Sequence, residues 1–275
     1  MKKTKNFVIF LALALIFLIL SACGAGQDSD LTTIRIGASA VPHSEILQNI
    51  APYMQSRGYN LEIIEFFDFV QPNLALAAGE LDANYFQTLP FLDNFNRTNN
   101  ENLIPVFGVH FEPLQIYAGR LNSIQNIPNG ASVGIPEDPT NGARALVLLS
   151  SLGLLELQSD LDLANITPSD ITYNPYNLQI ITLPPETLPP ALPDLDLAVI
   201  NGNVALNGSV IDRAIYGTAE DPSSPATIPF TNWIVIRGED YGNIPGLDVL
   251  IEAISTNEVR EFILQEYSTR IVPRF

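Results

Sequence analysis

Three short apolar runs decide the fold: TIRIG at residues 33–37, LEIIEF at 61–66 and LDANYF at 81–86. β-Branched and aromatic residues dominate these runs, which is typical of β-strands. Two segments between them have helical character, residues 44–55 and residues 72–78, and the second begins with Pro and is followed by Gly. Strands that alternate with helices in this way predict an α/β fold with a parallel sheet.

The same alternation restarts further along the chain. A β-rich stretch at 104–119, interrupted by Pro113, could run from one lobe toward another. A strand at 132–135, a helix at 141–152 and a strand at 195–200 follow it, and a strand at 232–237 could return to the first lobe. We therefore expect residues 32–120 and 226–275 to form one lobe and residues 121–225 the other. Ligands bind at the carboxyl ends of the strands in such sheets, which predicts a cleft between the lobes.

Two further stretches have a clear local signature. Five prolines between residues 183 and 193 predict an extended loop rather than a helix or a central strand. Residues 247–267 are expected to form a terminal helical region.

The N-terminus has the layout of a secretory signal. Lys2, Lys3 and Lys5 precede an uncharged apolar run at 7–20, which is followed by Leu-Ser-Ala-Cys at 20–23. A transmembrane anchor is the alternative, but it needs about 20 apolar residues and this run is shorter. Leu-Ser-Ala-Cys resembles the bacterial lipobox, in which the Cys becomes the lipidated N-terminus. We expect a signal peptide at 1–22, lipidation at Cys23, a tether at 23–31 and an extracytoplasmic position on the cell membrane.

The charge balance narrows the class of partner. The chain has 13 Lys+Arg against 30 Asp+Glu, a formal net charge of −17. A surface with this charge repels phosphate, which argues against nucleic acid as a partner.

The sequence offers little support for an enzyme. It contains no Gly-x-Ser-x-Gly elbow, no His-Glu-x-x-His zinc motif and no phosphate loop. Its two histidines are His43 and His110. A zinc site that combines them with carboxylates, or a catalytic triad, remains open in principle, because the partners need not be close in sequence. We expect a protein that is not an enzyme and that has no metal or cofactor.

A site for a small molecule has better support. Aromatic and polar residues cluster where strands are expected to end, at 66–69, 82–87, 109–113 and 138–144. Arg144 falls in the first turn of an apolar helix, where it could attract a carboxylate, although an exposed surface arginine is an equal alternative. Asn201 directly follows the strand at 195–200 and could face the cleft, or it could be a turn residue before Gly202.

Several motifs in the same order resemble those of the NlpA lipoprotein family. They are VPHSEIL at 41–47, DANYFQ at 82–87, HFEP at 110–113, PEDPTNGARAL at 136–146 and LAVINGN at 197–203. The resemblance covers nearly the whole chain after the N-terminal segment. It implies a two-lobe fold of the periplasmic-binding-protein type, type II, that closes on an amino acid. Members of the family are mostly methionine-binding lipoproteins that dock on the permease of an ABC importer, and through it serve the ATPase.

The resemblance also implies roles for individual residues. Arg144 would hold the ligand carboxylate, while Asn141 and Asn201 would help to fix the carboxylate and the ammonium group. Phe69 and Phe86 would form aromatic walls around a thioether.

Four residues would lie outside this inner set. His110 and Glu112 would lie at the edge of the cleft near the hinge. His43 is interpreted as a structural loop residue. Tyr85 alternates with Phe86 along its strand and is expected to point into its own lobe.

The sequence departs from the family pattern at two positions. The family usually reads Phe-Gln-His where this chain has Phe86, Gln87 and Thr88, and Phe69 stands where many members have Tyr. Both changes make the predicted pocket less polar. We expect a protein that captures methionine, a related small amino acid or a methionyl dipeptide for an ABC importer. A surface-exposed interaction protein or adhesin on the same fold is the alternative.

Overall fold

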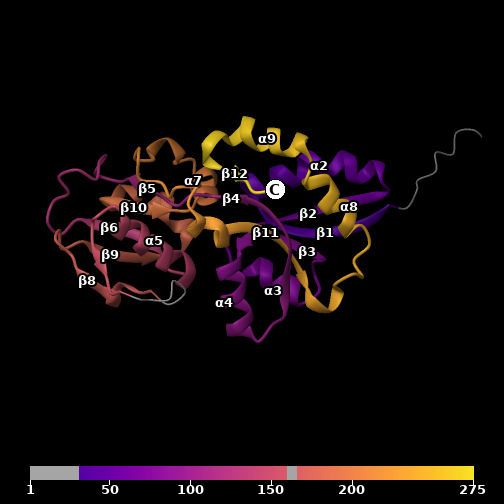
Figure 1. Cartoon of the computed structure of the whole chain (residues 1–275), viewed down its shortest axis with the longest axis horizontal. Helices are drawn as coiled ribbons and strands as arrows, with labels where there is room; N and C mark the ends of the chain where they lie inside the picture. Colours follow the sequence, from indigo (N-terminus) through magenta and orange to yellow (C-terminus); the bar gives the residue numbers. More distant parts are fainter. Residues whose placement is uncertain (1–30, 160–165) are drawn as a thin grey trace, which may run out of the picture.

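The computed structural model describes residues 31–159 and 166–275, and the two larger of its three sheets lie at opposite ends of an elongated molecule (Figure 1). The two-lobe α/β fold predicted from the sequence is thereby confirmed. The expected signal peptide at 1–22, the lipidation site Cys23 and nearly all of the tether lie outside the described residues.

The first sheet contains strands from the two ends of the described chain. Its order is β12-β4-β11-β3-β1-β2. The strands are β1 (Thr32–Ser39), β2 (Tyr59–Phe66), β3 (Ala83–Thr88), β4 (Leu103–Phe111), β11 (Thr231–Arg237) and β12 (Val272–Pro273). β1 runs parallel to β2 and β3, whereas β11 is antiparallel to both β3 and β4. The returning strand therefore sits inside the first sheet, as the sequence predicts.

Helices cover both faces of this sheet (Figure 1). On one face lie α2 (Glu45–Ser56), α8 (Leu247–Ile254) and α9 (Asn257–Tyr267), and on the other lie α3 (Gln71–Ala77) and α4 (Leu89–Asn99). Successive side chains of β11 point to opposite faces of the sheet. Ile234 packs against α2 and α8, whereas Val235 packs against α3 and α4. β11 is thus buried on both sides, which explains its continuous apolar run at 233–236.

The second sheet is smaller. Its order is β5-β10-β6-β9, with β5 (Gln115–Ala118), β6 (Ser132–Pro136), β9 (Gln179–Leu183) and β10 (Leu197–Ile200). β6 is parallel to both β9 and β10. The helices of this lobe are α5 (Pro139–Ser151), α6 (Leu188–Ala191) and α7 (Gly202–Asn207), and β7 (Glu156–Leu157) pairs with β8 (Ile171–Tyr173).

The structure differs from the sequence predictions in three places. β5 pairs with β10 in the second sheet, so the chain crosses before residue 115, although we expected the first lobe to extend to residue 120. The prediction of an extended loop at 183–193 was wrong, because α6 lies within it, flanked by single helical turns at Pro185–Thr187 and Leu192–Asp194. The prolines occupy first-turn positions, where a missing N–H costs no hydrogen bond. The terminal helical region divides into α8 and α9, and Thr256 caps the second helix.

Within residues 31–159 and 166–275, no helix is both long and apolar enough to cross a membrane.

Gly142 allows α5 to begin directly against the end of β6. A Cβ atom on Gly142 would lie 2.8 Å from the carbonyl oxygen of Pro136, which is too close for a carbon atom. In an open helix Gly→Ala stabilises by about 0.5–1 kcal/mol. We expect Gly142→Ala instead to lower the free energy of unfolding by about 1–3 kcal/mol, as measured by urea denaturation. An unchanged or raised stability would contradict this account of the close approach.

Candidate functional site

A pocket lies where the two sheets face each other. It is lined by Phe69, Phe86, Gln87, Thr88, Phe91, Glu112, Asn141, Arg144, Asn201, Asn203 and Asn232. All the binding residues predicted from the sequence are among these except His110. The lining comes from β3, α4 and β11 of the first lobe, from α5 and the start of α7 of the second, and from the connections that hold Phe69 and Glu112.

The side chain of Arg144 makes three hydrogen bonds. Asp138 caps the N-terminus of α5 through the Asn141 N–H at 2.9 Å, and this places Arg144 in the following turn. Its Nε donates to Glu220 Oε1 at 2.7 Å, and Nη2 donates to Glu220 Oε2 at 2.5 Å and to the Glu112 carbonyl at 2.7 Å. Only 4% of the side chain is exposed, so Arg144 is not a surface arginine. No hydrogen bond among the described residues uses Nη1.

Two aromatic rings flank the same guanidinium. Its central carbon lies 4.5 Å from the centroid of the Phe230 ring and 5.4 Å from that of Phe111. Cation–π attraction and the bidentate pair with Glu220 fix the plane of the guanidinium. Arg144 therefore enters the pocket as an oriented cation.

Hydrogen bonds between two amides fix the polar part of the pocket lining next to Arg144. Asn141 Nδ2 donates to the Asp138 carboxylate at 3.1 Å, and Asn201 Nδ2 donates to Asn141 Oδ1 at 2.9 Å. Because a carboxylate only accepts, each of the two amides has one possible orientation. Asn201 Oδ1 is left buried and without a hydrogen-bond partner among the described residues. It is an acceptor in need of a donor.

The remaining wall is aromatic. The ring centroids of Phe69 and Phe86 are 6.2 Å apart, and Phe91 lies edge-on at 6.2 Å from Phe69 and 5.9 Å from Phe86. Thr88, at the end of β3, lines the pocket and is half-buried. These three phenyl rings form an apolar compartment beside the charged and amide groups.

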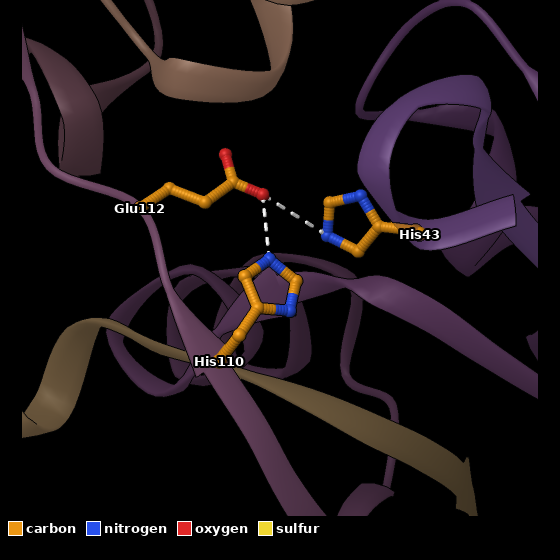
Figure 2. A group of neighbouring side chains, drawn as sticks. All are labelled: His43, His110 and Glu112. Atoms are coloured by element: carbon orange, nitrogen blue, oxygen red, sulfur yellow. Dashed lines mark hydrogen bonds and ion pairs between the residues drawn. The ribbon is translucent and has the colours of Figure 1, made fainter. Parts of the chain in front are cut away.

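His43, His110 and Glu112 form a buried polar cluster (Figure 2), and of these three only Glu112 lines the pocket. His110 Nε2 lies 2.8 Å from Glu112 Oε1, and His43 Nε2 lies 3.4 Å from the same oxygen. His43 Nε2 is also 3.1 Å from Asn232 Oδ1, and Tyr85 OH bonds to His110 Nδ1. His110 thus sits behind Glu112 rather than on the pocket wall. Tyr85 is buried in its own lobe, as predicted.

The same cluster has the composition of a metal site. Its two ring nitrogens and one carboxylate oxygen lie within 4.8 Å of one another, and these are groups that zinc prefers. Hydrogen bonds already engage both rings, because His110 Nε2 bonds to Glu112 Oε1 and His43 Nε2 bonds to Asn232 Oδ1.

Comparison with known proteins places the chain among lipoproteins. Residues 34–275 match the family model described as NlpA lipoprotein. The chain belongs to the NlpA lipoprotein family. The methionine-binding lipoprotein MetQ of Bacillus subtilis strain 168 is 30% identical, and the match covers 95% of this chain and 96% of that protein.

Two solved structures extend the likeness of this NlpA chain to three dimensions. A nutrient binding protein from Burkholderia cenocepacia bound to methionine matches with a TM-score of 0.81 and 35% identity, over 88% of this chain and 100% of that one. An ABC transporter periplasmic substrate-binding protein from Coxiella burnetii matches with a TM-score of 0.79 and 31% identity, over 88% and 100% of the two chains.

Sequence reasoning missed several residues around the NlpA pocket. Glu220, Asn232 and Asn203 carry no local motif that marks them. Glu220 is 76 residues from Arg144 in sequence, so only the fold pairs them. Phe91 had a weak signal, as an aromatic residue in the first turn after the β3 strand.

Burial decides the protonation of the cluster. Loss of solvation lowers the pKa of His43 to about 4 and that of His110 to about 3, so both rings are neutral at pH 7. Burial raises the pKa of Glu112, and His43, the Asn203 amide and Arg144 oppose this rise.

The lowered pKa values make stability depend on pH. Below pH 6.5 the unfolded histidines bind protons that the folded ones do not, so stability falls as the pH drops toward about 4. Glu112 works in the opposite direction, because its folded form takes up a proton first. We therefore compare the wild type with His43→Gln by urea unfolding at pH 7 and pH 4.5. The wild type should lose about 1–3 kcal/mol more than the variant. Equal losses would show that His43 is not buried in the neutral form.

Proposed function

We propose that this protein is a lipid-anchored extracytoplasmic solute-binding protein that captures methionine, a related small amino acid or a methionyl dipeptide for an ABC importer. One observation carries the proposal. The pocket holds a fixed cation, Arg144, together with an unpartnered buried acceptor, Asn201 Oδ1. A carboxylate and an ammonium group on one small molecule satisfy both.

The recognition of the carboxylate follows from the contacts of Arg144. With Nε and Nη2 engaged by Glu220 and Glu112, Nη1 is the donor that the guanidinium can give to a ligand. Asn232 lines the same pocket, and its Oδ1 is engaged by His43, so its Nδ2 group is a second donor for an anionic oxygen. Charge-assisted bonds of this kind are among the strongest in proteins.

The side chain of the ligand would lie in the aromatic compartment. Phe69, Phe86 and Phe91 offer ring edges and faces, and sulfur–ring contacts are favourable by about 0.3–1.5 kcal/mol. Thr88 adds only a small hydroxyl group to this wall. An unbranched thioether fits these surroundings better than a charged side chain does.

Binding rather than catalysis is supported by the state of the histidines. The chain has two His, and both rings are engaged with Glu112, Asn232 and Tyr85 behind the pocket. In the described part of the chain, no Ser or Thr hydroxyl hydrogen-bonds to either ring, so no nucleophile–base pair is formed there.

The relatives and the N-terminal sequence support the proposed delivery and anchoring. The relatives include a protein named as a methionine-binding lipoprotein and one named as an ABC transporter substrate-binding protein. We propose that Cys23 carries the lipid on the extracytoplasmic face of the cell membrane. The loaded protein would then dock on a permease and through it serve the ATPase.

Calorimetric titration of ligand-stripped protein tests the ligand and its anchor. We expect L-methionine, D-methionine or a methionyl dipeptide to bind, and Arg144→Ala to weaken binding by about 2–4 kcal/mol, or roughly 30- to 1000-fold. Arg144→Lys should lose nearly as much, because one ammonium cannot replace a guanidinium that serves Glu220, Glu112 and the ligand. The exposed Arg97→Ala is the matched control and should bind as the wild type. Absence of heat with all three ligands would refute the methionine proposal.

A ligand without its ammonium group isolates the role of Asn201. Wild type should bind L-methionine more tightly than 4-(methylthio)butanoate, which lacks the ammonium. Asn201→Leu should weaken the binding of methionine by about 1–3 kcal/mol and leave the affinity for the analogue nearly unchanged, because only methionine has an ammonium group to donate to Asn201 Oδ1. An equal loss for both ligands would mean that Asn201 shapes the pocket without binding the ammonium.

A further inference from the structure

His43 lies at a point where the pocket wall and the junction of the lobes meet. It is fully buried in the turn between β1 and α2. The centroid of its ring lies 4.6 Å from that of Tyr85 and 4.8 Å from that of His110. Its Nε2 atom faces two oxygens, Asn232 Oδ1 at 3.1 Å and Glu112 Oε1 at 3.4 Å. Figure 2 shows the rings of His43 and His110 next to each other, both facing the same carboxylate oxygen of Glu112.

These neighbours determine which nitrogen of His43 carries the proton. Burial keeps the ring neutral, with its pKa lowered to about 4, so one nitrogen is N–H and the other is a bare acceptor. A bare Nε2 would face two oxygen atoms with no proton between them. The proton therefore resides on Nε2, and Nδ1 is a buried acceptor without a partner among the described residues.

The His43 N–H in turn orients the amide of Asn232. Since Oδ1 of Asn232 accepts from His43, its Nδ2 group is the part that it can offer to the pocket. No hydrogen bond among the described residues uses this Nδ2 group. Without the His43 proton, nothing on that side would distinguish the oxygen of the amide from its nitrogen.

The same N–H holds the carboxylate that spans the two lobes. Glu112 Oε1 accepts from His110 Nε2 at 2.8 Å and lies 3.4 Å from His43 Nε2, while Oε2 accepts from the backbone N–H of Asn203 in α7 at 2.9 Å. The first lobe supplies the histidines and the second supplies the amide. Glu112 therefore joins the lobes next to the pocket.

We propose that His43 is a positioning residue for ligand binding: its Nε2–H turns the NH2 group of Asn232 toward the pocket and holds Glu112 at the junction of the lobes. This inference rests on the proposed function for its binding measurements, but its tautomer test does not.

A packing role alone does not account for a histidine here. An unpartnered buried acceptor such as Nδ1 destabilises the folded state. A leucine would contact Tyr85 and the ring of His110 without that cost. The advantage of histidine over an apolar residue at position 43 therefore lies in the contacts of its Nε2–H group with Asn232 and Glu112.

Matched variants separate positioning from packing. The amide of Gln can place a donor near the position of His Nε2, whereas that of Asn is too short and reaches only the position of Nδ1. In the full chain in detergent, we expect His43→Leu and His43→Asn to weaken L-methionine binding about tenfold or more, and His43→Gln to stay within about threefold of the wild type. The melting temperature of His43→Leu should stay close to that of the wild type, because the substitution removes one unpartnered acceptor, Nδ1, and leaves another, Asn232 Oδ1. Equal losses for Gln and Asn, or no loss with Leu, would overturn the proposal.

A double-mutant cycle tests whether His43 acts through Asn232. If it does, adding His43→Leu to Asn232→Ala should change affinity by no more than about threefold, because the group that His43 orients is already gone. Full additivity of the two losses would count against the proposal and would leave the methionine function intact.

The tautomer can be read without any ligand. Long-range ¹H–¹⁵N spectra of the imidazole rings at pH 7 should show His43 protonated on Nε2, with the signature of a bare Nδ1. An Nδ1–H tautomer would refute the inference whatever the protein binds. If the spectra agree and no tested amino acid binds, the proposed ligand is wrong and the orientation of Asn232 stands.

Discussion

The burial of the Arg144 guanidinium is the constraint on which the rest of the site depends. A cation removed from water must be paired and hydrogen-bonded, and this structure meets the requirement with groups from distant segments. Glu220 supplies the carboxylate, Glu112 supplies a carbonyl oxygen, and the rings of Phe111 and Phe230 lie within cation–π distance. Because Arg144 belongs to α5 and Phe111 to β4, this one side chain joins the second lobe to the first.

The junction between the lobes is polar rather than apolar, and specific hydrogen bonds orient its amide groups. Asp138 orients Asn141, which orients Asn201, and His43 orients Asn232. The Asp138 carboxylate only accepts, and the Nε2–H of His43 donates. These two groups therefore fix which end of each neighbouring amide is the oxygen and which is the nitrogen. The pocket therefore presents its donors and acceptors before a ligand arrives, which lowers the cost of binding. The net charge of −17 plays no such role, since the group aimed at the ligand is an arginine.

Much of the fold and part of the site were accessible from local sequence. Alternating apolar runs and helices predicted both lobes, and the helix predicted at 141–152 placed Arg144 near the start of α5. The short helix in the proline-rich stretch was missed because prolines at successive first turns look the same as prolines in a loop. Glu220 and Asn232 were missed because each acts on a partner more than 70 residues away. No local pattern records such a pairing.

Sequence by itself determined the family, the α/β class, the order of the elements and most of the residues that line the pocket. These properties reside in short-range periodicity, helix caps and motifs, which neighbouring residues fix. The tertiary structure alone decided that Arg144 is buried and paired, that Asn201 Oδ1 is unpartnered, and that His43 is joined to Asn232 and Glu112. The physical reason is that burial and hydrogen-bond partners arise only when strands distant in the chain close around one another.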